Sequence, residues 1–144
     1  QPTNKISSTI QIADWQEEVY DGESDGMRLS RATVKQRYSG GITGESTVEY
    51  LMIYHADGSA DFVGQERIVG SVDGHAGSLI LRHSGCYAHN EVSNTAEVVR
   101  GSGTGALVGF EGEFTYAAGH GRTVEIEFHY RSPSSAKIYA AANQ

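Results

Sequence analysis

The sequence predicts an all-β protein, a single antiparallel eight-stranded β-barrel. Its apolar segments are short and rich in Val, Ile, Thr, Tyr and Phe, and 18 glycines but only two prolines separate them. The Asp-Gly pairs at Asp57-Gly58 and Asp73-Gly74 are strong hairpin signals. Closure of eight strands into a barrel removes the exposed sheet edges and leaves room for one small ligand.

Each predicted strand is an apolar or alternating run between turn residues. In chain order the eight strands are Ser8 to Glu17, Leu29 to Tyr38, Thr47 to Tyr54, Phe62 to Val69, Ser78 to Tyr87, Val92 to Val99, Phe110 to Tyr116 and Thr123 to Arg131.

The last strand has the cleanest alternation of apolar and polar residues. Successive side chains of a strand point to opposite faces, so one set should pack inward and the other should face solvent. The inward set is Val124, Ile126, Phe128 and Tyr130, and the outward set is Glu125, Glu127 and His129.

The length of 144 residues fits one domain over residues 1–144, large enough to bury a core without disulfides. Residues 132–144 have no helix caps or periodicity, and we expect a flexible tail or a segment that docks on a partner. The single cysteine, Cys86, has no partner for a disulfide within the chain and is interpreted as a small apolar strand residue.

The formal net charge of -7 and the scattered basic residues argue against a nucleic-acid or anionic-membrane surface. No apolar run reaches the length of a transmembrane helix. The sequence slightly favours the cytoplasm. Because the chain begins with Gln1 rather than Met, the sequence leaves open whether a leader peptide was removed.

Three polar residues, Glu49, Glu66 and His83, interrupt apolar strand faces. A turn centred between Asp57 and Gly58 places Glu49 opposite Glu66. A four-residue loop over residues 73–76 then places His83 opposite Glu66. This register predicts that all three side chains meet inside the barrel, and a slip of one residue would send a whole strand's set to the other face.

These residue types suit acid-base chemistry. Two opposed buried carboxylates should not both stay ionised, so a shared proton, the histidine or a strand-end arginine must compensate them. A carboxylic acid beside a carboxylate and a histidine can donate and accept protons near neutral pH. We expect Glu66 to act as base or acid, His83 to relay its proton and Glu49 to set the charge, with Tyr38 or Tyr50 as a donor to an oxyanion.

The same register predicts an apolar pocket around the polar residues. Its expected ligand-binding residues are Tyr38, Leu51, Ile53, Phe62, Ile68 and Leu81. The opposite face carries Tyr50 and Met52, so periodicity alone does not choose inside from outside. Two alternatives to catalysis therefore stay open. Glu49, Glu66 and His83 form only a structural hydrogen-bonded network, or they face solvent on the outside of the barrel.

The sequence gives no sign of a cofactor or a metal site. The six histidines lack HxH or HExxH spacing. The segment Gly101-Ser-Gly-Thr-Gly lacks the Lys-Ser/Thr ending of a phosphate loop and is interpreted as a turn or bulge.

Several segments together carry a family resemblance. They are Arg31-Ala-Thr-Val, Ser46-Thr-Val-Glu-Tyr-Leu-Met, Ala56-Asp-Gly-Ser, Phe62-Val-Gly-Gln-Glu-Arg with Gly70, Leu81-Arg-His-Ser-Gly and Gly101-Ser-Gly-Thr-Gly. In this order they resemble the bacterial domain-of-unknown-function family 3224 over nearly the whole folded region. The resemblance implies a barrel similar to allene oxide cyclase but no settled activity, so any function drawn from that barrel is analogy at the level of fold.

Two classes of function follow, with a third beside them. The first is a cofactor-free isomerase or cyclase that uses the interior Glu and His residues. The second is a lipocalin-like carrier of an apolar ligand. The third is a structural oligomer with a filled barrel. The expected partners are a small apolar or mixed-polarity ligand and, where an oligomer forms, further copies of the chain, but neither nucleic acid nor membrane.

Overall fold

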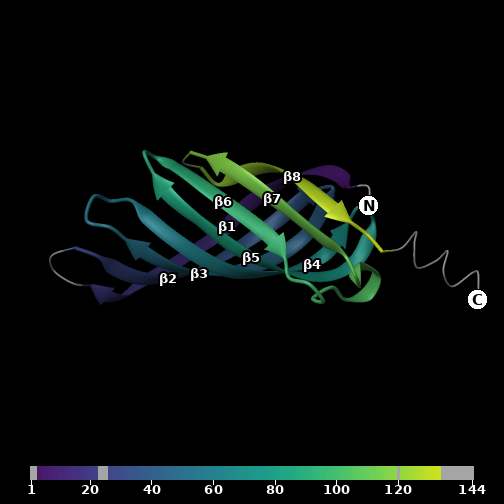
Figure 1. Ribbon diagram of the computed structural model, residues 1–144, viewed down its shortest axis with the longest axis horizontal. Coiled ribbons are helices and arrows are strands. Elements are labelled where there is room, and N and C mark those ends of the chain that lie inside the picture. The colour runs from purple at the N-terminus through teal and green to yellow at the C-terminus, as the bar shows by residue number, and fades with distance from the viewer. Residues whose placement is uncertain (1–2, 23–25, 120, 134–144) are drawn as a thin grey trace, which may run out of the picture.

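The computed structural model describes residues 3–22, 26–119 and 121–133, and these form one closed antiparallel barrel (Figure 1). Each strand pairs with the next, and the first strand closes the ring against the last. This confirms the predicted fold class. The strands are β1 (Asn4–Gly22), β2 (Arg28–Gly40), β3 (Ile42–Tyr54), β4 (Ala60–Val72), β5 (His75–Ala88), β6 (Glu91–Val98), β7 (Glu111–Ala118) and β8 (Thr123–Arg131).

The turn between β3 and β4 corrects the predicted register. It spans residues 55–59, an odd number, and it is closed by hydrogen bonds from His55 N to Ser59 O (2.8 Å) and from Gly58 N to His55 O (3.0 Å). The Asp57 carboxylate also accepts a bond from the Ser59 amide (2.9 Å). The turn is therefore centred on Asp57, which shifts the pairing by one residue.

This one-residue shift moves the β3 side chains to the other face. Val48 and not Glu49 lies opposite Glu66, and Tyr50 and Met52 face the interior. The prediction that Glu49 points inward was therefore wrong: it lies outside, where it pairs with Arg31 at 3.2 Å.

The turn between β4 and β5 differs from the expectation by two residues. Asp73 and Gly74 have φ values of 50° and 83°, which suits a two-residue type I′ turn, and Val72 pairs with His75. Glu66 consequently faces Leu81 and not His83. Because the side-chain period is two, this shift leaves both Glu66 and His83 on the inner face.

A bulge in β1 shapes one end of the barrel. The pairing with β2 shifts between Ile12 and Asp14, and the pairing with β8 ends at Gln11. Beyond this point β1 no longer pairs with β8 and stays paired with β2 alone, which forms a lip at this end of the barrel. The bulge reverses the alternation, so Trp15 and Glu17 lie opposite the inward residues of β2.

The barrel interior contains two apolar clusters. The larger cluster surrounds Leu79, Phe114 and Phe128. The loop between β6 and β7 closes this end of the barrel. It includes the short 3-10 turn η1 (Gly105–Leu107), and it buries Leu107 and Phe110. The smaller cluster lies towards the lip, around Val48 and Phe62. One end of the barrel is thus packed and the other more open.

Within the described residues, no helix is both long and apolar enough to cross a membrane. The predicted tail of residues 132–144 lies outside the described residues from position 134 onward.

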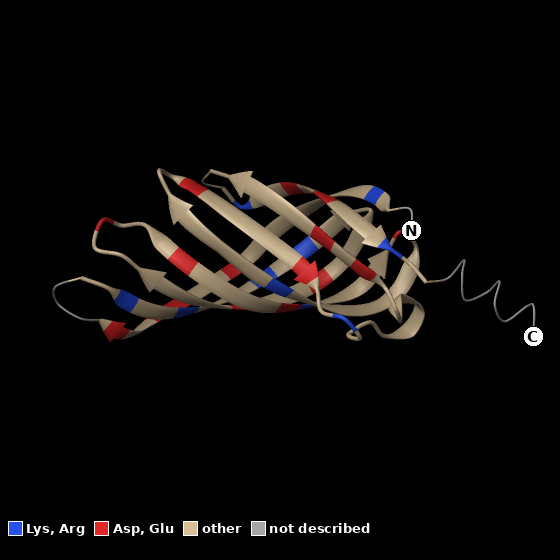
Figure 2. Cartoon of the chain, in the orientation of Figure 1, with Lys and Arg blue, Asp and Glu red and all other residues tan. Residues whose placement is uncertain are grey.

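The outer wall carries interspersed acidic and basic positions along its strands (Figure 2). It also carries Leu51 and Ile53, with 52% and 39% of their surface exposed, so their predicted place in the interior was wrong. Both errors follow from the odd turn that reversed β3. Cys86 is on β5 as expected, and it is exposed.

Candidate functional site

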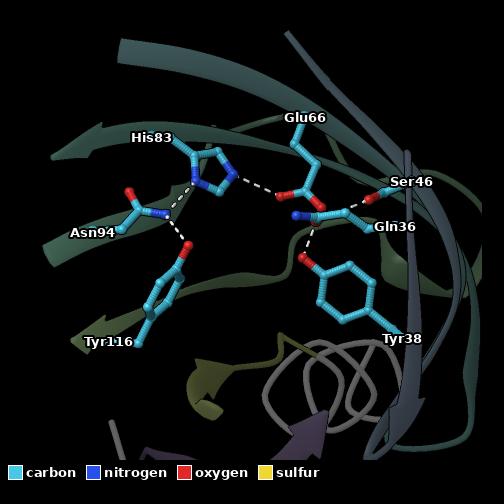
Figure 3. A network of polar contacts seen from close by, with 7 residues as sticks. All are labelled: Gln36, Tyr38, Ser46, Glu66, His83, Asn94 and Tyr116. Carbon is cyan, nitrogen blue, oxygen red and sulfur yellow. Dashed lines mark hydrogen bonds and ion pairs between the residues drawn. The ribbon is translucent and has the colours of Figure 1, made fainter. Parts of the chain in front are cut away.

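A buried polar network lies in the middle of the barrel (Figure 3). His83 Nε2 lies 2.6 Å from Glu66 Oε1, and the Tyr38 hydroxyl donates to Glu66 Oε2 at 2.7 Å. All three residues are almost fully buried. Each comes from the inward face of a different strand, β2, β4 or β5, so barrel closure is what brings them together.

Asn94 on β6 extends the network towards β7. Its side-chain Nδ2 lies 2.9 Å from His83 Nδ1 and donates to the Tyr116 hydroxyl at 3.2 Å. Because the amide N–H donates, His83 Nδ1 must accept, and the ring proton sits on Nε2. His83 Nε2 then donates to the Glu66 carboxylate. Asn94 Oδ1 is buried without a hydrogen-bond partner among the described residues.

A separate cavity of about 310 Å³ lies between this network and the open end of the barrel. This volume is near the lower limit of small-molecule sites, which span about 300–1,000 Å³. Aromatic and aliphatic side chains dominate its wall, with only a few polar groups. The lining residues are Ile12, Trp15, Gln36, Tyr50, Met52, Tyr54, Ala60, Phe62, Tyr87, Val92, Tyr116, Ala118, Gly119, Gly121 and Val124.

Tyr116 links the cavity to the buried network, because it lines the former and accepts a bond from Asn94 of the latter. Tyr50 also lines the cavity and packs edge to face on the His83 ring, with 5.7 Å between ring centroids. Glu66 and His83 do not line the cavity. The acid-base pair is thus one layer of side chains away from any molecule held there.

Burial and the charge of Glu66 raise the pKa values of three tyrosines near the network. Burial, then the nearby Glu66 carboxylate and its hydrogen bond, raise the pKa of Tyr38 well above its ordinary value. Burial chiefly raises the pKa of Tyr50 and of Tyr116 as well, and Glu66 contributes to both. All three hydroxyls therefore keep their protons at neutral pH and act as hydrogen-bond donors.

Glu17 organises the mouth of the cavity. Its carboxylate accepts hydrogen bonds from Ser30 Oγ (2.6 Å), the Tyr54 hydroxyl (2.6 Å) and Trp15 Nε1 (3.0 Å). Burial acts to raise the pKa of Glu17, but these three bonds and the Arg28 charge outweigh it and lower the pKa. Burial and the bond to Glu17 raise the pKa of Tyr54 to about 12. One carboxylate thereby fixes two aromatic walls of the cavity.

We expect Glu17→Gln to remove a pH-dependent part of the stability. Because folding lowers the pKa of Glu17, its contribution is full above the ordinary value of 4.5 and is lost as the pH falls through the lower folded value. The partly exposed site limits the loss to about 1 kcal/mol at neutral pH. Urea unfolding from about pH 3 to pH 8 should show the two proteins converging at the acid end.

The matched control for this variant is Glu18→Gln, which changes an exposed neighbour on the other face of β1. A Glu17→Gln deficit that persists unchanged at the acid end would contradict the assigned role.

The structure places the remaining predicted site residues as follows. Tyr38, Ile68 and Leu81 are buried inside the barrel, and Phe62 lines the cavity. The catalytic roles predicted for Glu66 and His83 stay predictions, and Glu49 lies outside the site.

Sequence reasoning missed Gln36, Asn94 and Tyr116, and it assigned Tyr50 to the wrong face. A signal for Tyr50 was present in Gly64, its partner on β4. A Cβ at Gly64 would come within 2.7 Å of the Tyr50 ring. A glycine inside a strand often marks such a close approach, and it indicates an inward aromatic residue on the neighbouring strand.

Among the described residues, no group of three or more His, Cys, Asp or Glu side chains is arranged to hold a metal ion. The segment around Gly101 is a loop, as predicted, and it packs on β5 through a hydrogen bond from Ser78 N to Thr104 Oγ1 at 3.0 Å.

Comparisons with known proteins point to one family. The family model described as "Protein of unknown function (DUF3224)" matches residues 6–130. A solved structure of a protein of unknown function from this family, from Shewanella oneidensis MR-1, is similar to the chain with a TM-score of 0.78 and 26% sequence identity. The similarity covers 91% of this chain and 98% of that one. A comparison with curated proteins finds no match.

Proposed function

We propose that this chain, which belongs to the DUF3224 family of proteins of unknown function, binds a small and mainly apolar molecule in the open end of its barrel. The observation that carries the proposal is the cavity of about 310 Å³ with its aromatic wall. A barrel that served only as a structural unit would gain stability by filling this space, because unfilled apolar volume costs free energy.

The polar groups of the wall support binding in a defined orientation. Small-molecule sites typically combine an apolar lining with a few placed polar groups. Gln36, Tyr50 and Tyr116 are such groups, and they come from three different strands of the closed barrel. A ligand would therefore have its polar end fixed on several sides and its apolar part against Phe62 and Met52.

Trp15 gives a direct test of binding, because it lines the cavity and is the only tryptophan of the chain. We expect the neutral dye phenylnaphthylamine to bind saturably with a stoichiometry of one, and to accept energy from Trp15. Ring stacking between Trp15 and Tyr50, at 6.1 Å between centroids, places the donor beside the site. A fluorescence titration with tryptophan excitation measures this transfer.

The control is Trp15→Phe, which should abolish energy transfer while direct excitation of the dye still reports binding. Dye fluorescence that rises without saturation would contradict a defined site. Native mass spectrometry of protein from its own host would then identify any natural ligand.

Catalysis is a second candidate function, and the buried Glu66–His83 pair favours it. A cofactor-free isomerase or cyclase, by analogy with allene oxide cyclase, would use such a pair for proton transfer. The proton would have to pass the layer of Tyr50 and Tyr116, because the pair does not line the cavity. Binding requires no such step, and we therefore place it first.

A further inference from the structure

The hydrogen bonds beneath the cavity restrict the chemistry of the ligand. Tyr50 and Tyr116 both line the cavity, and each hydroxyl influences the pKa of the other. Even a hydrogen bond between the two hydroxyls would use only one of their two O–H protons. The other proton needs an acceptor elsewhere.

No described residue supplies that acceptor. Asn94 approaches Tyr116 with its Nδ2, which is a donor, at 3.2 Å. Exchanging the Asn94 oxygen and nitrogen would turn both N–H groups towards the buried position that now lacks a partner. Unpaired buried N–H groups are rarer than unpaired carbonyl oxygens, so the present orientation is favoured. It leaves the two tyrosines with one unused donor.

Gln36 adds a second donor to the wall. Its Oε1 accepts a hydrogen bond from Ser46 Oγ at 3.5 Å, so its Nε2 protons remain for other partners. The unused polar groups of the described cavity wall are thus hydrogen-bond donors. They match a ligand oxygen that accepts a hydrogen bond.

The charge of the surroundings selects a neutral acceptor over an anionic one. The described lining residues include no Lys or Arg to balance an anion. Behind the tyrosines lies Glu66, whose negative charge already opposes ionisation of Tyr50 and Tyr116. A ligand carboxylate at this position would face that repulsion in a medium of low dielectric.

We propose that the ligand is a neutral molecule whose inner end carries an acceptor oxygen, such as a ketone or an ester carbonyl, hydrogen-bonded by the Tyr50–Tyr116 pair. This inference rests on the proposed binding function and names its ligand class.

Three fluorescent probes test the inference. Prodan is a dimethylaminonaphthalene with a propionyl ketone; the second probe lacks the propionyl group, and the third carries a carboxylate in its place. We expect prodan to bind about fivefold more tightly than the probe without the ketone, the value of one neutral hydrogen bond, and the carboxylate to bind most weakly. The double variant Tyr50→Phe/Tyr116→Phe should remove the ketone preference while still binding the probe without it.

The control is Tyr20→Phe, which changes an exposed tyrosine on β1 and should preserve all three affinities. If all three probes bind wild type equally, or the double variant keeps the preference for prodan, the inference is overturned while the binding function stands. If wild type binds phenylnaphthylamine but none of the three probes, the inference fails and the binding function stands; if it binds none of the four, both proposals fail.

Discussion

Replacement of His83 by leucine is expected to lower the free energy of unfolding by about 3–5 kcal/mol, because it leaves the buried Glu66 carboxylate with the Tyr38 hydroxyl alone. The carboxylate has no exposed side-chain surface, and His83 is its closest neighbour at 2.6 Å. Glu66→Leu should cost a comparable amount, about 1–3 kcal/mol for each of the two groups it leaves without a partner, His83 Nε2 and the Tyr38 hydroxyl.

The triple variant Tyr38→Phe/Glu66→Leu/His83→Leu should recover most of this loss. It removes the charge, the imidazole and the hydroxyl that bonds Glu66, and it replaces them with apolar groups of similar size. Replacing a buried charged network by well-packed apolar residues is often neutral or stabilising. We therefore expect the triple variant to lie within about 2 kcal/mol of wild type.

Urea unfolding followed by Trp15 fluorescence and by circular dichroism measures all of these variants. A triple variant as unstable as His83→Leu would show that the network is needed for folding in itself. The expected recovery would instead mean that stability does not explain why the barrel keeps a buried polar network. Its retention would then point to ligand orientation or proton transfer.

The turns decided how far the candidate site could be predicted. Periodicity identified the strands, and the alternation of β8 placed Ile126, Phe128 and Tyr130 in the core as expected. The face to which the side chains of the next strand were assigned then depended on the length of the connecting loop. The two-residue error at Asp73-Gly74 preserved the inner face of β5, whereas the one-residue error around Asp57 reversed β3. An Asp-Gly pair signals a hairpin but does not fix the number of residues in its loop.

The cavity depends on features that no local pattern shows. The bulge beside Ala13 reverses the alternation of β1 and turns Trp15 inward. Small residues at the open end, among them Ala118 and Gly119, leave the space that larger side chains would fill. Both effects arise only when the strands meet around the closed barrel, so the hydrophobic pattern of one strand does not reveal them.

Ala118→Phe is expected to abolish binding while preserving the fold. Ala118 lines the cavity near its mouth, and a phenyl ring in its place would occupy the space where the ligand is proposed to sit. We expect the affinity for phenylnaphthylamine to fall by about a hundredfold or more, about 2.8 kcal/mol of binding free energy. The free energy of unfolding should stay the same or rise by up to about 2 kcal/mol, because the ring buries apolar surface in existing space.

The matched control is Ala117→Phe, the same substitution one position earlier on β7. Ala117 is exposed, so its ring should point into solvent and leave the affinity unchanged. Opposite stability and binding effects at Ala118 distinguish a filled cavity from a damaged fold, since damage would lower both. Full affinity in Ala118→Phe would instead place the dye elsewhere on the molecule and contradict the cavity as the binding site.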